Sequence, residues 1–425
     1  MTVIGIIGDI ENVSDQLLYC KINKKNRLLI SYDSYLSLPN HVKSSCQVYV
    51  YKSEDDKCLF HEIDYMFEDN IIDKTFIYGK NLIEKMIKDV YIDQIEMYSK
   101  IPHCYLDLLP LLDDFESSVD FVSEKNIHFK SWTRKFHPET NYLHLLKKVI
   151  QNGSSRQTRN AETISLFGES VEFDLKYGFP LLTTKKMFFS GIVKELLWFL
   201  NGKTNVNELK ADGVHIWDGN TTREFLDGIG LNHYPEGCAG PIYGYQWRNF
   251  NAPYDVETMM PKESGFDQLM FCIKELQTNP TSRRMVMSGW NPCQMSQMCL
   301  PPCHVLYQFY VEGERLSCQM YQRSADLFLG LPFNIASTAL LVTLIGTLTG
   351  YKPGKIKICI GDAHIYKTHV DNVFTQIKRI PLPLSQIHID HFVSDPNTQI
   401  KEWKAEHIHL VGYQSHGRLS SAMIA

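Results

Sequence analysis

A cysteine preceded by two prolines and followed by a histidine is the first residue of this chain that could do covalent chemistry. Cys303 lies in Leu300-Pro-Pro-Cys-His304, where the prolines restrict the approach of the backbone. A thiol becomes a nucleophile when nearby cations favour the thiolate. The sequence therefore makes Cys303 a candidate nucleophile, with an inert loop cysteine as the alternative interpretation.

Three arginines could supply such cations or bind an anion. Arg283 and Arg284 are adjacent, and Arg323 lies in a polar, uncharged setting before Ser324. The guanidinium fork is suited to bidentate binding of phosphate or carboxylate. Ordinary surface charge and ion pairing are the alternative for each of them.

A carboxylate interrupts an otherwise apolar helical segment. Glu195 lies within Ile192–Leu200, which is apolar nearly all round and therefore predicts a buried helix. A buried carboxylate is costly unless it is paired or used in chemistry. Glu195 is thus a candidate acid or base, unless it forms an ion pair with Lys185, Lys186 or an arginine.

Three further side chains could recognise a nucleoside. His364 and Tyr366 are two residues apart, so in a strand they point to one side and could bind a sugar. The amide of Asn334 offers a donor and an acceptor together, which suits the edge of a base. The alternatives are a half-buried surface pair for His364 and Tyr366, and a helix cap for Asn334.

These candidates are carried by a mixture of helices and strands in the C-terminal two thirds of the chain. Helices are expected at Ile192–Leu200 and Ile335–Leu348, which are apolar on all sides. Strands are expected at Met285–Ser288, Val305–Val311, Leu316–Tyr321 and Ile356–Ile360.

The first 134 residues have a different texture. Short β-branched and aromatic runs predict strands at Val3–Ile7, Leu28–Ile30, Val48–Tyr51, Phe76–Tyr78 and Tyr91–Tyr98. Helical spacing over Asn81–Lys88 predicts a strand–helix–strand unit, and Val119–Arg134 is typical of a hairpin. A short connector, Thr133–Thr140, joins the two parts.

Composition excludes several classes of protein. The 425 residues carry 43 basic and 48 acidic side chains, a net charge of −5, which argues against a dedicated nucleic-acid binder. The most apolar stretch, Ala339–Leu348, is too short to span a membrane, and the N-terminus lacks a signal-peptide pattern. We therefore expect a cytoplasmic protein (in the host cytoplasm if the source is viral) with reduced cysteines. The lone Cys299-x3-Cys303 pair predicts no metal site.

Residues 137–425 closely resemble the thymidylate synthases over the whole length of that family. The resemblance implies an α/β (α+β) fold with a mixed, strongly twisted sheet, and a homodimer that packs through one face of that sheet. The matching segments are Gly178-Phe-Pro-Leu-Leu-Thr-Thr-Lys-Lys, Lys194-Glu-Leu-Leu-Trp-Phe-Leu-Asn-Gly, Gly240-Pro-Ile-Tyr-Gly-Tyr-Gln-Trp-Arg, Pro302-Cys-His, Cys318-Gln-Met-Tyr-Gln-Arg-Ser-Ala-Asp and Gly361-Asp-Ala-His-Ile-Tyr.

The resemblance implies reductive methylation of dUMP to dTMP with 5,10-methylenetetrahydrofolate, which leaves as dihydrofolate. It assigns catalysis to Cys303 as nucleophile and to Glu195, Tyr243 and Arg323. It assigns dUMP binding to Arg159, Arg283, Arg284, Gln322, Arg323, Ser324, Asp326, Asn334, His364 and Tyr366. It assigns folate binding to Trp217, Asp326, Phe333 and Ile424, with Ala422–Ala425 as a tail that closes over the ligands. Arg283 and Arg284 would reach into the site of the partner subunit.

One loop departs from the family pattern. Members usually carry Arg-Thr-Gly-x-Gly-Thr as a phosphate loop, whereas this chain has Arg156-Gln-Thr-Arg-Asn-Ala-Glu-Thr163, without glycines and one residue shorter. Arg159 is the candidate phosphate ligand, with Arg156 in reserve. The insert Asn220–Cys238 is similar to the longer eukaryotic form.

Residues 1–134 resemble dihydrofolate reductase more weakly, in the order found in fused protozoal and plant enzymes. Leu28–Pro39 and Thr75–Lys80 carry the similarity. The Gly-Arg that meets the cofactor phosphates is replaced by Ser31-Tyr32, and the second glycine of a Gly-Gly pair by Lys80. These losses predict a smaller α/β domain without reductase activity, for which NADPH is not expected as a cofactor.

Three rival functions stay open at this stage. A pyrimidine hydroxymethylase would use the same fold, with water in place of hydride, although Asn334 favours uracil over cytosine. A bifunctional enzyme would also reduce dihydrofolate with NADPH through residues 1–134. A nucleotide-binding regulator would have lost catalysis, which the retained Cys303, Glu195, Tyr243 and Arg323 argue against.

Overall fold

The computed structural model describes the backbone of seven strands between residues 2 and 134, and residues 137–422 other than 159–160 in full. The predicted helix over 81–88 lies outside the described residues. So do the predicted site residues Arg159 and Ile424, and with Ile424 most of the predicted closing tail.

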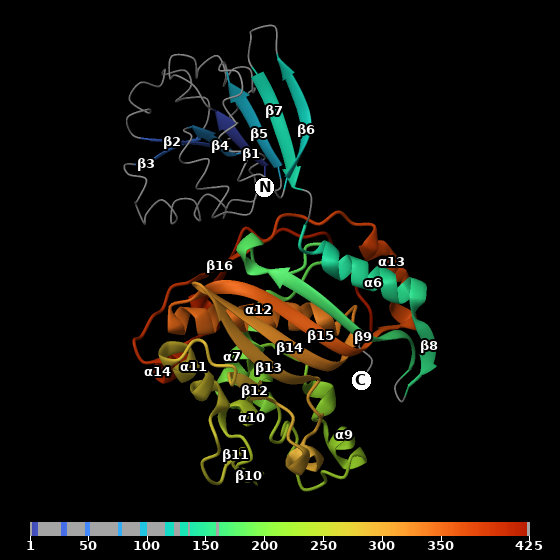
Figure 1. Cartoon of the computed structure of the whole chain (residues 1–425). Helices are drawn as coiled ribbons and strands as arrows, with labels where there is room; N and C mark the ends of the chain where they lie inside the picture. Colours follow the sequence, from blue (N-terminus) through green and yellow to red (C-terminus); the bar gives the residue numbers. More distant parts are fainter. Residues whose placement is uncertain are drawn as a thin grey trace.

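The first seven strands form one sheet in the order β3-β2-β4-β1-β5-β7-β6 (Figure 1). Neighbouring strands from β3 to β5 are parallel, and β7 is antiparallel to both β5 and β6. All five predicted strands and the predicted hairpin are confirmed. The bounds are β1 Thr2–Ile6, β2 Arg27–Ser31, β3 Gln47–Tyr51, β4 Thr75–Tyr78, β5 Gln94–Ser99, β6 Phe115–Val122 and β7 His128–Arg134.

The larger sheet is mixed and has six strands in the order β12-β13-β14-β15-β9-β8. Each predicted strand of this region is present, and β14 and β15 are longer than predicted at both ends. The bounds are β8 Ser154–Gln157, β9 Glu162–Asp174, β12 Val286–Ser288, β13 His304–Glu312, β14 Arg315–Asp326 and β15 Lys352–Tyr366. Two small ribbons pair β10 Tyr254–Asp255 with β11 Met260–Pro261, and β16 Gln386–Ile389 with β17 Ile408–Val411.

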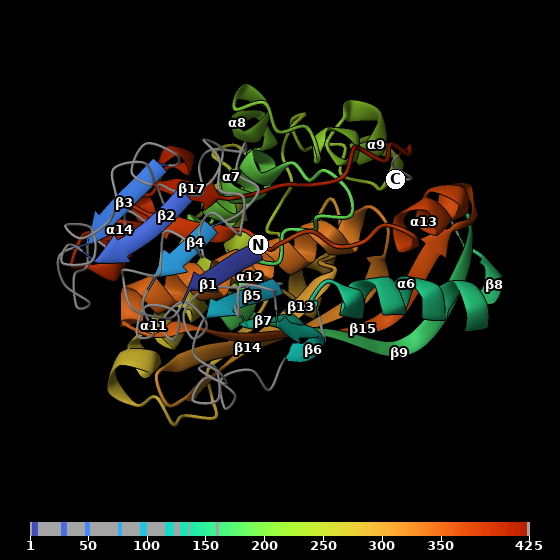
Figure 2. The ribbon, with the colours of Figure 1, turned by 90° about the horizontal axis from the view of Figure 1, so that it is seen from above.

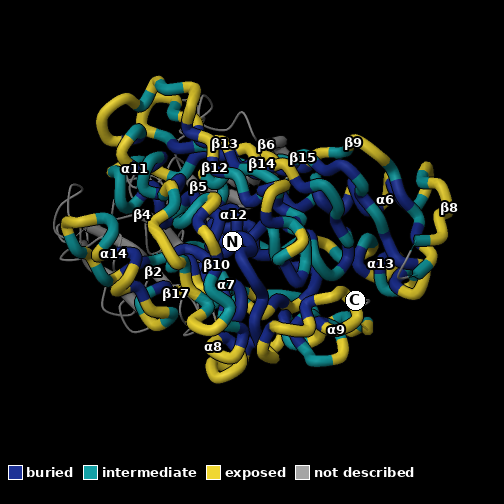
Figure 3. The backbone as a smooth tube through the Cα atoms, turned by 90° about the horizontal axis from the view of Figure 1, so that it is seen from below, coloured by how far each residue is buried: buried dark blue, intermediate teal, exposed yellow. Residues whose placement is uncertain are grey.

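Helices cover this sheet and form the core. Helix α12 (Gly330–Thr349) packs on β14 and β15, α6 (Thr140–Asn152) packs on β9, and α7 (Phe189–Leu200) packs on α12 (Figure 2). Figure 3 shows buried backbone around α12 and exposed backbone at β8. The other helices are α8 Val206–Ala211, α9 Arg223–Gly228, α10 Gly244–Arg248, α11 Gln268–Thr278, α13 Val370–Ile377 and α14 Pro396–Glu402.

Helix α12 confirms the prediction of an apolar core helix over Ile335–Leu348. In the part of the chain that the structure describes, it is the one helix long and apolar enough to span a membrane, and most of it is buried inside the protein. Its residues from Ile335 to Val342 are buried without interruption. An all-round apolar helix is therefore explained here by packing on every side.

The register of the central strands brings the ends of three of them to one edge of the sheet. β14 and β15 are parallel, with Asp326 opposite His364 at their carboxyl ends. β13 runs antiparallel to β14, with His304 at its start opposite Gln322. The start of β13 and the ends of β14 and β15 therefore meet, and the segment after β14 turns directly into α12.

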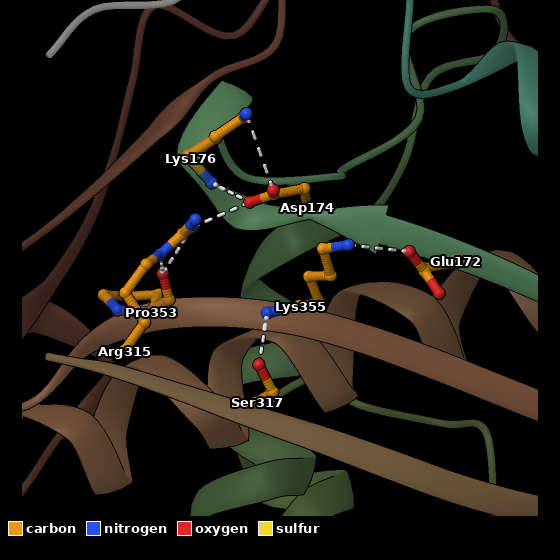
Figure 4. Close-up of polar contacts among 7 residues, drawn as sticks. All are labelled: Glu172, Asp174, Lys176, Arg315, Ser317, Pro353 and Lys355. Carbon is orange, nitrogen blue, oxygen red and sulfur yellow. Dashed lines mark hydrogen bonds and ion pairs between the residues drawn. The ribbon is translucent and has the colours of Figure 1, made fainter. Parts of the chain in front are cut away.

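Polar contacts fasten the opposite edge, where β14 and β15 begin (Figure 4). The Arg315 guanidinium lies 2.7 Å from an Asp174 carboxylate oxygen and donates to the Pro353 carbonyl. The Lys355 backbone N–H donates to the Ser317 hydroxyl at 2.9 Å, beside a bulge between these strands. These contacts hold the register that aligns the other edge.

A buried carboxylate anchors the start of the part of the chain that carries the larger sheet. Glu139 is fully buried and accepts four hydrogen bonds, from the backbone N–H and hydroxyl of Thr183 and of Thr184, at 2.5–2.9 Å. Just before it, the His137 ring lies 2.8 Å from the Leu382 carbonyl and accepts from the Glu139 N–H. The connector is therefore locked to two distant segments.

Glu139→Gln is expected to lower the free energy of unfolding by about 3 kcal/mol, because the amide nitrogen cannot accept hydrogen bonds and leaves buried donors unpaired. Urea unfolding of the two proteins measures the loss. Glu314→Gln, at a carboxylate that is 82% exposed, is the control and should change stability by less than about 0.5 kcal/mol. Equal stability of Glu139→Gln and the parent would refute the anchoring role.

Candidate active site

Cys303 lies directly before β13, at the end of the sheet where the start of β13 meets the ends of β14 and β15. Its backbone N–H donates to the Tyr243 hydroxyl at 2.7 Å, and its carbonyl accepts from the Arg323 N–H at 3.0 Å. The thiol is partly buried and unpaired with any other cysteine. The extended Pro301-Pro302 segment thus presents the sulfur at a fixed place with partial access to solvent.

The Arg323 guanidinium is fixed beside this sulfur. Its Nε donates to the Pro302 carbonyl at 2.9 Å and its Nη2 to the Pro301 carbonyl at 2.8 Å. The same Nη2 lies 3.7 Å from Cys303 Sγ. A held cation at this distance attracts negative charge on sulfur.

Glu195 is held by an indole. Trp217 Nε1 donates to Glu195 Oε1 at 2.8 Å. Burial raises the pKa of the Glu195 carboxyl to about 7, and the bond from Trp217 lowers it. Among the described residues Glu195 forms no ion pair, so the alternative of a pair with Lys185, Lys186 or an arginine is wrong; the Lys185 ammonium donates to the Phe328 carbonyl instead. Glu195 can therefore exchange a proton near neutral pH.

Tyr243 lies between the Glu195–Trp217 pair and the cysteine. Its ring packs against Phe199, Trp217 and His304, with centroids 5.1–5.8 Å apart. Burial holds the pKa of its hydroxyl well above the ordinary value, so the phenol keeps its proton. The hydroxyl accepts from the Cys303 N–H, so its own proton can point to a ligand.

The backbone of Tyr243 is in an unusual conformation. Its φ is +30°, a region that side-chain-bearing residues rarely adopt. It directly precedes α10, and the next residue, Gly244, lies so close to the Phe199 carbonyl that no side chain fits there. Strain of this kind is common where a side chain must be aimed at a site.

An amide pair lies where a base could be recognised. Gln322 is buried, and its amide nitrogen donates to Asn334 Oδ1 at 2.9 Å. Asn334 lies inside α12, so the alternative of a helix cap is wrong. Nearby, burial lowers the pKa of the His304 ring to about 4, so this imidazole stays neutral beside the Tyr307 hydroxyl at 3.1 Å.

The end of β15 carries the predicted sugar-binding pair. His364 is partly buried and Tyr366 is buried, and their rings lie 5.2 Å apart on one side of the strand. Across the register, Asp326 accepts the backbone N–H groups of Phe328 and Leu329 at 2.9 and 3.1 Å. These bonds turn the chain from β14 into α12 and fix the edge of the site.

Arg283 and Arg284 do not join this group within one chain. Both are exposed and precede β12, whose Val286 lies opposite Gln308. The Phe309 N–H donates to the carbonyl of Met285, so the arginines lie at the far end of β13 from Cys303. At roughly 3.3 Å per residue, that separation is about 20 Å.

Of the remaining predicted contacts, Trp217 belongs to this polar network through its bond to Glu195. Ser324 and Phe333 are partly buried, and Trp217 is buried. Among the residues that the structure describes, no three His, Cys, Asp or Glu side chains are arranged to hold a metal ion.

Three residues at this edge were not singled out from sequence. His304 and Asp362 each lie inside a segment that does carry the resemblance, so their spacing from Cys303 and His364 was the available signal. Trp290, whose ring lies 5.9 Å from the Arg323 guanidinium, had no sequence signal.

Comparison with known proteins places these features in a family. The family model described as Thymidylate synthase matches residues 140–425. A bifunctional dihydrofolate reductase-thymidylate synthase of Paramecium tetraurelia is 38% identical over 402 residues, covering 91% of this chain and 85% of that protein.

Other relatives match a shorter part of the chain. A bifunctional dihydrofolate reductase-thymidylate synthase of Zea mays is 45% identical over 288 residues, 68% of this chain. The match spans 54% of the maize protein, about half its length. A thymidylate synthase of equine herpesvirus 2 is also 45% identical over 288 residues, covering 98% of that protein.

Proposed function

The chain belongs to the thymidylate synthase family, and from this premise we propose that it converts dUMP to dTMP, using 5,10-methylenetetrahydrofolate and releasing dihydrofolate. Residues 140–425 form the thymidylate synthase domain, a methyltransferase of dTMP biosynthesis and folate metabolism. The observation that carries the proposal is the placement of Arg323 and Tyr243 against Cys303 at one sheet edge.

In the proposed reaction the Cys303 sulfur bonds to C6 of the uracil ring, and the electron pair moves to C5 as an enolate. C5 then bonds to the methylene carbon of the folate. Loss of the C5 proton and departure of tetrahydrofolate leave an exocyclic methylene, which accepts a hydride from tetrahydrofolate as the sulfur leaves. We assign the movement of protons to Glu195, whose pKa is about 7, and to the Tyr243 hydroxyl, which contacts the Cys303 N–H.

We assign the rest of the site by the chemistry of each side chain. The neutral amide pair suits the uracil edge, and the pair at the end of β15 suits the ribose hydroxyl. For dUMP we propose Arg159, Gln322, Arg323, Ser324, Asp326, Asn334, His364 and Tyr366, joined by Arg283 and Arg284 of the partner subunit. For the folate we propose Trp217, Asp326, Phe333 and Ile424.

A second subunit is supported by an uncovered face of the larger sheet. Val286, Gln308 and Gln319 lie opposite one another on β12, β13 and β14, so they share one face, and all are exposed. Tyr310 and Tyr321 continue that face, with 64% and 37% of their surface exposed. A face with exposed aromatic side chains is typical of a surface that another layer covers. We propose that the homodimer packs here.

A mixture of two inactive variants should recover activity if the arginines act across the dimer. Cys303→Ala supplies intact arginines, and an Arg283→Ala/Arg284→Ala variant supplies the cysteine. Random exchange makes half of the dimers hybrid with one complete site each, so about a quarter of parent activity should return. The rate of dihydrofolate formation after denaturing and refolding the mixture measures it. Each variant refolded alone is the control, and no recovery would place the arginines in their own chain's site.

For residues 1–134 we propose a dihydrofolate-reductase-like domain without reductase activity, as an α/β unit. The five parallel strands of its sheet, from β3 to β5, support an α/β unit, and the Paramecium relative, which matches 91% of the chain, is named as bifunctional. The loss of reductase activity rests on the sequence at Ser31-Tyr32 and Lys80. We also propose a cytoplasmic location.

The decisive experiment incubates the purified chain with dUMP and methylenetetrahydrofolate and follows dihydrofolate by absorbance, then adds NADPH. Dihydrofolate that forms and persists supports a synthase without a reductase. Its disappearance with NADPH would make the chain bifunctional. A product heavier by a hydroxyl oxygen, found by mass spectrometry without dihydrofolate, would indicate the hydroxymethylase.

A further inference from the structure

Asp362 lies between two basic side chains from distant parts of the sequence. Its Oδ2 is 3.1 Å from Arg156 Nη1, and its Oδ1 is 3.5 Å from the Nδ1 of His364. His364 is the proposed ribose ligand, and Arg156 belongs to the loop that departs from the family pattern. The carboxylate therefore joins these two parts of the nucleotide site.

The sheet explains how they meet. Asp362 and His364 are two residues apart on β15, so their side chains leave the same side. Arg156 on β8 lies opposite Thr163 of β9, and Thr163 lies opposite Tyr366 of β15. The Arg156 side chain thus reaches across β9 to the end of β15.

We infer that Asp362 is a positioning residue for His364, and that Arg156 fixes Asp362 in that role; the inference rests on the proposed function. A carboxylate beside Nδ1 holds the proton on that nitrogen and leaves Nε2 as an acceptor. A neutral imidazole of that tautomer can accept a hydrogen bond from a ribose hydroxyl. The ring also gains a fixed orientation toward Tyr366.

The contacts of Asp362 support an ionised carboxylate. The His364 ring, 3.5 Å away, lowers the pKa of the Asp362 carboxyl, and the charge of Arg156 lowers it further, against the opposing effect of partial burial. The Arg156 side chain is 57% exposed and that of Asp362 30%. An ion pair this open adds little to folding stability, so its removal should act on substrate binding and leave the fold intact.

The geometry also bears on the role of Arg156. As the reserve phosphate ligand, it would act on the phosphate directly and independently of Asp362. As a clamp on Asp362, it would act through His364 on the ribose. The two roles differ in whether a nucleoside without phosphate is affected.

The first test compares Asp362→Asn with the parent by steady-state kinetics. KM for dUMP should rise about 5- to 10-fold while kcat changes less than about 2-fold, because ribose binding is weakened and the reacting groups are untouched. Asp362→Glu should recover part of the affinity. The matched control is Asp390→Asn, which breaks another Asp–His pair, 2.7 Å from His409 on the β16–β17 ribbon, and should leave both parameters unchanged.

The second test measures binding of dUMP and deoxyuridine to Arg156→Gln, Asp362→Asn and the double variant by calorimetry. Both single variants should weaken both ligands, and the double variant should be no weaker than Asp362→Asn, as expected for residues that act as one unit. Additive losses confined to dUMP would make Arg156 a phosphate ligand and overturn the clamp.

Unchanged kinetics of Asp362→Asn in an active parent would overturn the inference as a whole. An inactive parent enzyme would instead refute the proposed function, and the deoxyuridine measurements would still test whether Asp362 orders the ribose pocket.

Discussion

Cys303→Ala should reduce kcat by at least about 10³-fold, because the sulfur supplies the covalent bond on which every later step depends. Affinity for dUMP should change less than about 3-fold, since the phosphate, ribose and base contacts come from other side chains. Calorimetry measures the affinity, and dihydrofolate formation measures kcat. Intact mass spectrometry after rapid denaturation should detect a protein–nucleotide adduct in the parent and none in the variant.

Cys293→Ser is the matched control for this substitution. Cys293 is an exposed free cysteine that is not among the proposed site residues, and its loss should leave kcat and the adduct unchanged. Substantial turnover by Cys303→Ala would remove this cysteine from the mechanism. An adduct that survives in that variant would point to another thiol.

Glu195→Gln should lower kcat by about 10²-fold and also raise stability at alkaline pH. The rate falls because the amide cannot take or give the proton that we assign to this position. The amide oxygen can still accept from Trp217 Nε1, so the pocket should keep its shape. The loss should therefore fall on kcat more than on either KM.

The stability change follows from the direction of the pKa shift. Burial raises the pKa of Glu195 from 4.5 to about 7. The carboxyl ionises near pH 4.5 in the unfolded chain but only near pH 7 in the folded one, so folding becomes less favourable as pH rises between these values. The full penalty is present above pH 7 and is absent below pH 4.5.

A shift of this size corresponds to about 3 kcal/mol at pH 8 and less than about 1 kcal/mol at pH 5. Glu195→Gln removes the penalty, so its thermal midpoint should exceed that of the parent by about 3–5 °C at pH 8 and by much less at pH 5. The exposed Glu208→Gln is the control and should show no pH-dependent gain. A Glu195→Gln variant that is no more stable at pH 8 than the parent would contradict burial as the cause.

The strands that carry Cys303, Arg323 and His364, or border on them, could be predicted in part from local pattern. β-branched and aromatic runs predicted β12, β13, β14 and β15, and the apolar surfaces of α7 and α12 predicted their burial. β8 and β9, which pair beside the end of β15, were not predicted. The ends were less predictable, because β14 and β15 continue into polar residues such as Ser324 and Asp362. Those residues extend the strands because their backbones pair across the sheet.

The site itself was predictable in its members more than in their contacts. The segments around Cys303 and His364 carry the resemblance, but the pairing of Asp362 with Arg156 joins residues 206 positions apart. The indole partner of Glu195 and the position of Asn334 inside α12 likewise depend on tertiary packing. The remoteness of Arg283 and Arg284 depends on strand register, which no local pattern specifies.

The buried carboxylate of Glu139 limits where residues 1–134 can be separated from the rest of the chain. A fragment that begins after Glu139 would leave the buried hydroxyls of Thr183 and Thr184 without their acceptor. A thymidylate synthase domain that is stable on its own therefore has to start at His137 or earlier. The same limit applies to the positions at which proteolytic cleavage or gene fusion leaves this domain stable. Replacement of residues 1–134 by an unrelated domain would be tolerated only if the junction lies before His137.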